Sequence, residues 1–196
     1  TAALVAAGAI VIPALNKKGI FVGTHIKNIA GVKDTDFNCE DDIKNISKKD
    51  FPVLDRDSAT LMKEKIISAK ADCNSVGGVL ETAVIGLPAG LGEPWFDTVE
   101  GMLSHAMFSV PAVKGIEFGL GFEFADKTGS QANDQMYVEN GNVKCYTNNN
   151  GGVTGGITNG MPILFRVVVK PTPTISKEQK TVDIRDMSNT TLLAHG

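Results

Sequence analysis

The residues best suited to chemistry lie in one run, which reads NNNGGVTGGITNGMPILFRVVVKPTPT from Asn148 to Thr174. Asparagine and glycine readily adopt positive φ, and such loops leave backbone N–H groups uncovered. A loop of this kind allows the backbone to approach a planar or phosphorylated ligand closely. The Val- and Ile-rich strand Ile163 to Val169 follows it and ends at Lys170, whose charge we expect to face that ligand. The same pattern also fits a Gly-rich hairpin with a purely structural role.

Other reactive side chains are sparse. The three cysteines are far apart, form no C-x-x-C pair and have no histidine at ligand spacing, which argues against disulfides and zinc and favours a reduced, cytoplasmic setting. Glu81 is an isolated acid that is more typical of a solvated or salt-bridged group than of a catalytic one. We assign no catalytic residue, and none of the histidines has a good claim to act as a general acid: His25, His105 and His195.

Composition places the chain among globular proteins of ordinary type. It has 196 residues, of which 42% are hydrophobic and 21% charged. The net charge of −3 and the absence of a basic stripe argue against nucleic acid as the main partner. An anionic small ligand stays possible, because a local lysine cluster can outweigh the global charge. The apolar run from Ala2 to Leu15 is too short for a membrane span, so we expect no membrane association.

The amino-terminal part should position these groups through one helix, one strand and a polar connection. We expect the apolar helix from Ala2 to Leu15 to be buried, since it has no polar face, and Pro13 should kink or end it. Because this helix begins at once and without an initiator Met, the sequence is expected to start inside a larger protein. A strand is predicted over Gly19 to Ile29, and the charge run from Asp34 to Lys49 is typical of a solvated loop or short helix.

Two further helices flank a strand in the middle of the chain. A helix capped by Asp57 or Ser58 should run to about Asp72, and Val79 to Leu87 is predicted to be a strand. A capping box at Asp97 starts the next helix, which Pro111 closes. Its apolar positions predict a core-facing stripe: Val99, Met102, Leu103, Ala106 and Val110.

The carboxy-terminal half reads as strands and hairpins. We expect a strand over Val113 to Phe118, followed by phenylalanines that fill the core: Phe118, Phe122 and Phe124. A type I′ hairpin should turn at Asn140-Gly141, with later strands over 181–184 and 190–193. Antiparallel strands with segregated helices predict an α+β fold, residues 1–196 should form one domain, and the lack of a G-x-G-x-x-G motif that opens a helix argues against a Rossmann domain.

Several blocks of the chain resemble the chorismate synthase family, and they occur in the family's order. The blocks are the amino-terminal Thr1 to Ile10, the segment Gly86 to Pro94 with Phe96-Asp97, the segment Pro111 to Gly115, Gly129-Ser130 with Asn133-Asp134, and the asparagine and glycine loop with Lys170 to Thr172. Each block alone is weak evidence, but together they span nearly the whole chain.

The resemblance implies a fold with helices sandwiched between antiparallel sheets. It implies the 1,4-elimination of phosphate from 5-enolpyruvylshikimate 3-phosphate to give chorismate, the last step of the shikimate pathway of aromatic amino acid biosynthesis. The family requires reduced FMN, is associated with NADP, and usually forms a homotetramer. The FMN contacts that the resemblance implies are Pro111, Ala112, Gly155, Lys170, Pro171, Thr172, Pro173 and Thr174, with Asn148 and Asn149 as weaker candidates.

The chain departs from the family pattern in two respects. Pro173 and Thr174 stand where the family usually has two serines, so one hydroxyl is lost. The family's amino-terminal third, with its histidines and most substrate-binding arginines, and the Arg-His-Asp-Pro motif expected after Gly196 have no counterpart here. We therefore expect the 196 residues alone to be inactive. Two other interpretations stay open: a non-catalytic flavin- or phosphate-binding fragment of the scaffold, and an α+β interaction domain.

Overall fold

The computed structural model describes residues 1–194, so the interpretation of His195 lies outside the described residues. The helices are α1 (Ala2–Lys17), α2 (Glu40–Asn45), α3 (Arg56–Ala71), α4 (Val99–Phe108) and α5 (Gly129–Ala132), with 3₁₀ turns at Ile46–Lys48, Trp95–Asp97 and Gly121–Asp126. The strands are β1 (Phe21–Ile29), β2 (Val32–Lys33), β3 (Gly78–Ile85), β4 (Val113–Phe118), β5 (Met136–Glu139), β6 (Asn142–Cys145), β7 (Val153–Thr154), β8 (Ile157–Thr158), β9 (Ile163–Val169), β10 (Gln179–Asp183) and β11 (Ser188–Leu192).

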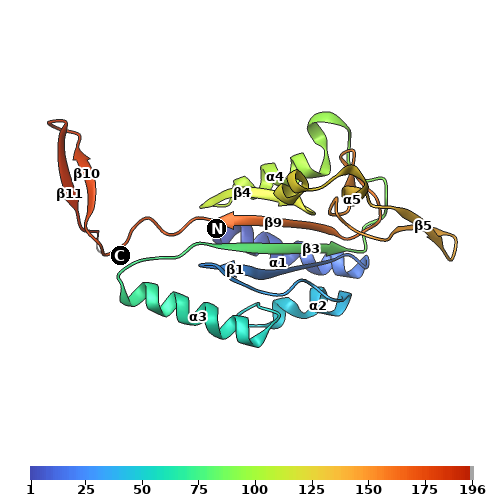
Figure 1. Ribbon diagram of the computed structural model, residues 1–196, viewed down its shortest axis with the longest axis horizontal. Coiled ribbons are helices and arrows are strands. Elements are labelled where there is room, and N and C mark those ends of the chain that lie inside the picture. Colours follow the sequence, from blue (N-terminus) through green and yellow to red (C-terminus); the bar gives the residue numbers. More distant parts are fainter. Residues whose placement is uncertain (195–196) are drawn as a thin grey trace.

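A five-stranded antiparallel sheet in the order β2-β1-β3-β9-β4 is the centre of the molecule (Figure 1). The predicted α+β class is confirmed, because helices flank this sheet. Since side chains alternate between the faces of a strand, β9 contributes to two clusters. Phe165 and Val167 face the cluster that α4 covers, whereas Leu164 faces the cluster formed with Ile43 of α2.

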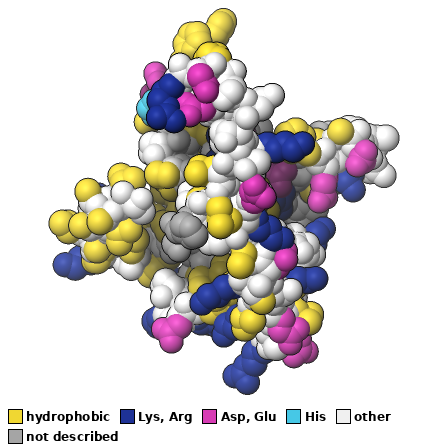
Figure 2. All heavy atoms as spheres, turned by 90° about the vertical axis from the view of Figure 1, so that its left-hand side faces the viewer, with side chains coloured by type: hydrophobic (Ala, Val, Ile, Leu, Met, Phe, Trp, Pro, Cys, Tyr) yellow, Lys and Arg dark blue, Asp and Glu magenta, His cyan; other side chains and the backbone are white. Residues whose placement is uncertain are grey.

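Helix α1 is more exposed than its composition predicts. None of its residues is buried, and Leu4, Val5 and Ile10 are 54, 67 and 77% exposed. The burial prediction was therefore wrong for the described residues, since the helix lies beside the sheet and no element of residues 1–194 covers its outer side (Figures 1 and 2). Pro13 does not end the helix, which continues to Lys17.

The predicted caps were wrong by one to three residues. Asp55 caps α3 by accepting a hydrogen bond from the Ser58 N–H, and Thr98 caps α4 by accepting one from the Gly101 N–H. In each helix an earlier or later side chain reaches the unsatisfied N–H groups better than the predicted one. The predicted stripe of α4 is only partly correct, since Met102 is 60% exposed.

The predicted hairpin at Asn140-Gly141 is confirmed, and the two predicted later strands are present as a second hairpin, β10–β11. Asn140 and Gly141 join β5 to β6 and have φ of 52° and 77°, as a type I′ turn requires. The β10–β11 hairpin projects away from the main sheet (Figure 1). Phe122 is 85% exposed, so the expectation that it fills the core was wrong; the chain turns there into a 3₁₀ segment that carries the side chain outward.

Candidate cofactor site

Two segments meet where β9 ends and β4 begins; we call residues 111–114 and 170–174 the lysine end. The Lys170 N–H donates to the Ala112 carbonyl over 2.9 Å, and Val113 pairs with Val169. Ala112 has a φ of 71°, a conformation that is uncommon outside glycine. The structure therefore brings Pro111 and Ala112 next to Lys170, although nearly sixty residues separate them in sequence.

The rest of the predicted Lys170–Thr174 segment is exposed and is held mainly by its backbone. The Ser75 hydroxyl donates to the Thr172 carbonyl over 2.7 Å, and the Gln179 amide donates to the Pro173 carbonyl over 3.3 Å. These contacts leave the two threonine side chains, Thr172 and Thr174, on the surface. The segment thus presents an ammonium group and two hydroxyls to an incoming ligand.

An apolar cavity of about 510 Å³ lies beside the lysine end, between α3 and the sheet. Val169, the residue before Lys170, lines it together with Ser75 and Gly77. Its other walls are mainly aliphatic side chains, among them Ile26, Ile66 and Leu80. An apolar cavity of this kind suits a ligand with a planar ring.

Asn148 and Asn149 lie at the opposite end of β9. The Leu164 N–H donates to the Gly151 carbonyl, which places this loop six residues before Lys170, or about 20 Å away along the strand. The asparagine loop and Lys170 therefore do not form one cradle within a single chain, and that prediction was wrong. A β-strand lengthens by about 3.3 Å with each residue. The seven residues of β9 therefore hold the asparagine loop and Lys170 at opposite ends of the strand.

Hydrogen bonds of the two asparagine side chains serve the loop itself. The Asn148 amide donates to the Pro162 carbonyl over 2.8 Å and its oxygen accepts from the Gly152 N–H over 2.8 Å. The Asn149 amide donates to the carbonyl of Ala132 over 3.1 Å. These contacts shape the loop and occupy groups that a ligand would need.

Gly155 lies in the turn between β7 and β8. It has a φ of 61°, and no atom lies within 4 Å of where its Cβ would be, so its backbone faces open space. The next residue, Gly156, accepts a hydrogen bond from the Val99 N–H at the start of α4 over 2.9 Å. Because Ala112 follows the other end of this ten-residue helix, Gly155 lies about 15 Å from the lysine end.

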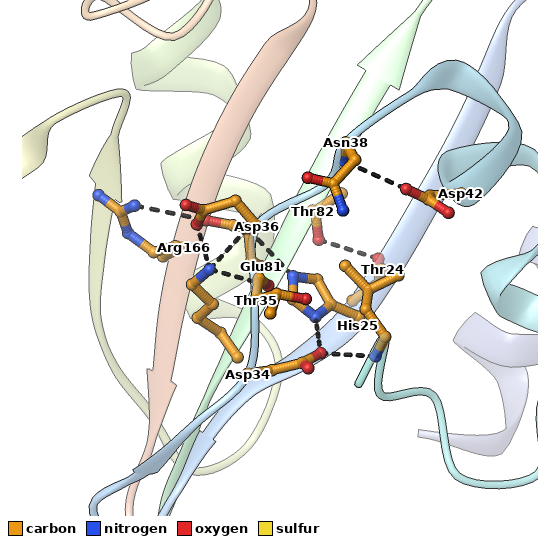
Figure 3. A network of polar contacts seen from close by, with 12 residues as sticks. Thr24, His25, Asp34, Thr35, Asp36, Asn38, Asp42, Glu81, Thr82 and Arg166 are labelled. Atoms are coloured by element: carbon orange, nitrogen blue, oxygen red, sulfur yellow. Dashed lines mark hydrogen bonds and ion pairs between the residues drawn. The ribbon is translucent and has the colours of Figure 1, made fainter. Parts of the chain in front are cut away.

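A row of charged side chains crosses the sheet between these two ends (Figure 3). His25, Glu81, Arg166 and Glu117 are direct partners on β1, β3, β9 and β4. The two ring nitrogens of the fully buried His25 lie 2.7 Å from a carboxylate oxygen of Asp34 and 3.0 Å from one of Glu81. Of the two alternatives predicted for Glu81, the salt-bridged one is thus correct, because this side chain is neither isolated nor solvated.

Arg166 connects the buried part of the row to the surface. Its guanidinium donates to Glu117 over 2.7 Å, to Glu81 over 3.3 Å and to the Gly119 carbonyl over 2.6 Å. Burial disfavours the ionised form of Glu81, but the His25 hydrogen bond and the charges of Lys27, His25 and Arg166 hold its pKa below the ordinary value. The sequence does contain a signal for this row, because charged residues occupy positions within predicted strands. Only the strand register shows that these residues are neighbours.

A flavin nucleotide fits the lysine end better than it fits the asparagine loop. The lysine end begins directly after Val169, which lines an apolar cavity, and its lysine and threonine side chains are exposed, whereas the asparagine side chains are already hydrogen-bonded. Among residues 1–194 no group of three His, Cys, Asp or Glu side chains is arranged to hold a metal ion. Nor does any helix in this part of the chain have the length and apolar character needed to cross a membrane.

Comparison with known proteins gives one consistent family. The sequence model described as "Chorismate synthase" matches residues 1–196. The chain is 41% identical over 192 residues to the chorismate synthase of Methanosarcina acetivorans, covering 98% of this chain and 53% of that protein. It is 43% identical over 196 residues to that of Dehalococcoides mccartyi, covering 100% and 54%.

A solved crystal structure of chorismate synthase has the same fold, with a TM-score of 0.80 and 35% identity over 88% of this chain and 55% of that one. The chain thus spans about half the length of the relatives that it matches.

Proposed function

The chain belongs to the chorismate synthase family, and on that premise we propose that it forms the central part of an enzyme that eliminates phosphate from 5-enolpyruvylshikimate 3-phosphate to give chorismate. A carbon–oxygen lyase of this kind acts in the shikimate pathway, which leads to the aromatic amino acids. We further propose that it acts in the cytoplasm as a homotetramer, that it is a single domain over residues 1–196, and that NADP is associated with its flavin chemistry.

The observation that supports this proposal most is the meeting of Ala112 and Lys170 at the lysine end, beside an apolar cavity. In the proposed complex, the Lys170 ammonium offsets the negative charge of a phosphate or of a reduced flavin ring. The hydroxyls of Thr172 and Thr174 donate hydrogen bonds, whereas Pro171 and Pro173 stiffen the segment.

The remaining predicted contacts take different roles in the proposal. Pro111 and Ala112 would contact the flavin through their backbone and small side chains, and Gly155 would allow the chain to pass close to it. Asn148 and Asn149 would act only by shaping their loop. Reduced FMN, when bound, would supply electron density that assists cleavage of the substrate's C–O bond. This chain's residues would bind, orient and neutralise charge.

A second candidate is a non-catalytic fragment that binds flavin or phosphate. It is favoured by the positions of the described histidines, because the loss of a leaving phosphate is helped by a nearby proton donor. His25 is fully buried between two carboxylates, and His105 is exposed on α4 outside the lysine end. Neither histidine belongs to the segments that form the lysine end.

Measurements on the 196-residue chain and on a longer chain together separate these candidates. We expect titration with FMN to show binding, and we expect no chorismate to form when reduced FMN and 5-enolpyruvylshikimate 3-phosphate are supplied. A longer chain that carries the rest of the family sequence should form chorismate under the same conditions. If the longer chain binds FMN without turnover, the non-catalytic candidate is correct; if neither chain binds FMN, both candidates fail.

A further inference from the structure

Strand β4 begins with a β-bulge at Lys114, a residue that is not among the proposed flavin contacts. Val113 pairs with Val169 and Gly115 pairs with Val168, so Lys114 is an extra residue opposite this end of β9. A bulge turns side chains away from the regular alternation and occurs often beside functional sites. Here it leaves Lys114 exposed at the end of the sheet.

Lys114 and Lys170 extend from adjacent backbone. Lys170 donates its N–H to Ala112, two residues before Lys114, and β4 and β9 lie side by side there (Figure 1). Two long, flexible lysines that start this close can direct both ammonium groups at one ligand.

No carboxylate neutralises either lysine within residues 1–194. The acid on the same strand, Glu117, is already paired with Arg166. Other lysines of the described chain do have acidic partners, as Lys44 has Glu40 and Lys144 has Glu139, so nothing prevents Lys114 and Lys170 from meeting an anionic ligand. Like charges on neighbouring strands repel each other, so an anion that binds both lysines would offset that repulsion.

We propose that Lys114 is a second phosphate-binding residue that, together with Lys170, holds a phosphate monoester at the lysine end. Lysine binds phosphate as a compact point charge, and two such charges match a group that carries nearly two negative charges. The inference rests on the proposed function, which offers two monoesters: the phosphate of FMN and the phosphate of the substrate. It gives a role to a residue that is not among the FMN contacts implied by the family resemblance.

The test compares Lys114→Ala with the wild-type chain in titrations with FMN, riboflavin and 5-enolpyruvylshikimate 3-phosphate. Riboflavin has the ring of FMN without its phosphate. We expect the variant to bind one of the two monoesters about tenfold more weakly, which corresponds to about 1.4 kcal/mol, and to bind riboflavin as the wild type does. Lys114→Arg, which keeps the charge, should restore most of the affinity.

Lys127→Ala is the matched control, because Lys127 is an exposed lysine beyond the other end of β4 and its loss changes the net charge equally. Weaker FMN binding identifies the cofactor phosphate, and weaker substrate binding alone identifies the substrate phosphate. If Lys114→Ala binds both monoesters like wild type while Lys170→Ala binds FMN more weakly, the inference is wrong and the proposed function stands. If the wild-type chain binds none of the three ligands, the proposed site and this inference fall together.

Discussion

Replacing Glu81 with leucine should be among the most destabilising single changes in the charged row. Glu81 is 1% exposed, and its carboxylate faces His25 at 3.0 Å, Arg166 at 3.3 Å and Lys27 at 3.5 Å. The leucine side chain is similar in size, so the change removes the charge with little loss of packing. It leaves three donors around an apolar group inside the sheet.

The expected cost follows from the burial of the partners. Removing one member of a buried ion pair costs about 3–5 kcal/mol, because the charge that remains has neither water nor a counter-ion. Arg166 keeps its contact with Glu117, and Lys27 keeps its contact with Asp36, which limits the loss. We therefore expect the free energy of unfolding to fall by about 3 kcal/mol at neutral pH.

Chemical denaturation at pH 7 measures this change, with an unchanged dependence on denaturant concentration as the check on two-state behaviour. Glu139→Leu is the control, because Glu139 pairs with Lys144 on the exposed β5–β6 hairpin and both side chains are 49% exposed. The control should change stability by less than about 1 kcal/mol. If the two variants lost the same free energy of unfolding, the argument that burial makes the ion pairs of Glu81 more stabilising would be refuted.

The pH dependence of stability gives an independent check that the ionised form of Glu81 is the stabilising one. The pKa of Glu81 is held below the ordinary value of 4.5, so the carboxylate's contribution is fully present above that value and is lost as the pH falls through the folded-state pKa. The stability difference between wild type and Glu81→Leu should therefore be constant near neutral pH and shrink in acid. A difference that grows on acidification would contradict the assignment.

Three further changes test the loop, a close backbone contact and the lysine end. Asp134→Asn should destabilise by about 1–3 kcal/mol in denaturation, because Asp134 accepts hydrogen bonds from Thr147 and from the backbone of the asparagine loop; hydrogen exchange in that loop should rise. Gly119→Ala should cost about 3 kcal/mol or more, since φ is 54° and a Cβ would overlap the Asn149 carbonyl oxygen, whereas Gly129→Ala, with open space around it, should not destabilise. Lys170→Ala should weaken FMN binding by about 1.5–3 kcal/mol in a titration, and unchanged affinity would remove Lys170 from the site.

Local patterns predicted most of the secondary structure. The strand Ile163–Val169 and the Asn140-Gly141 turn were predicted correctly, because a run of β-branched residues and a pair of positive-φ residues act through their own backbone. The helix caps were missed by one to three residues, since several nearby side chains compete for the same N–H groups. The burial of α1 was mispredicted because an apolar composition indicates only that a helix favours contact with other residues. It does not indicate whether the described residues make that contact.

The candidate site divides in the same way. Resemblance pointed to Ala112 and Lys170, and the pairing of β4 with β9 brings them into contact. It also pointed to Asn148 and Asn149, which the length of β9 holds about 20 Å away.

The sequence by itself determined which strands, turns and helices form and which family the chain resembles, because those depend on residues close together along the chain. Only the tertiary structure decided which charges are neighbours: His25, Glu81, Arg166 and Glu117 become a row through the register of four strands. It likewise places Lys114 in a single-residue bulge two residues after Ala112, the residue whose carbonyl accepts the Lys170 N–H. Register and bulges depend on how whole strands pack, so no local pattern could have predicted either arrangement.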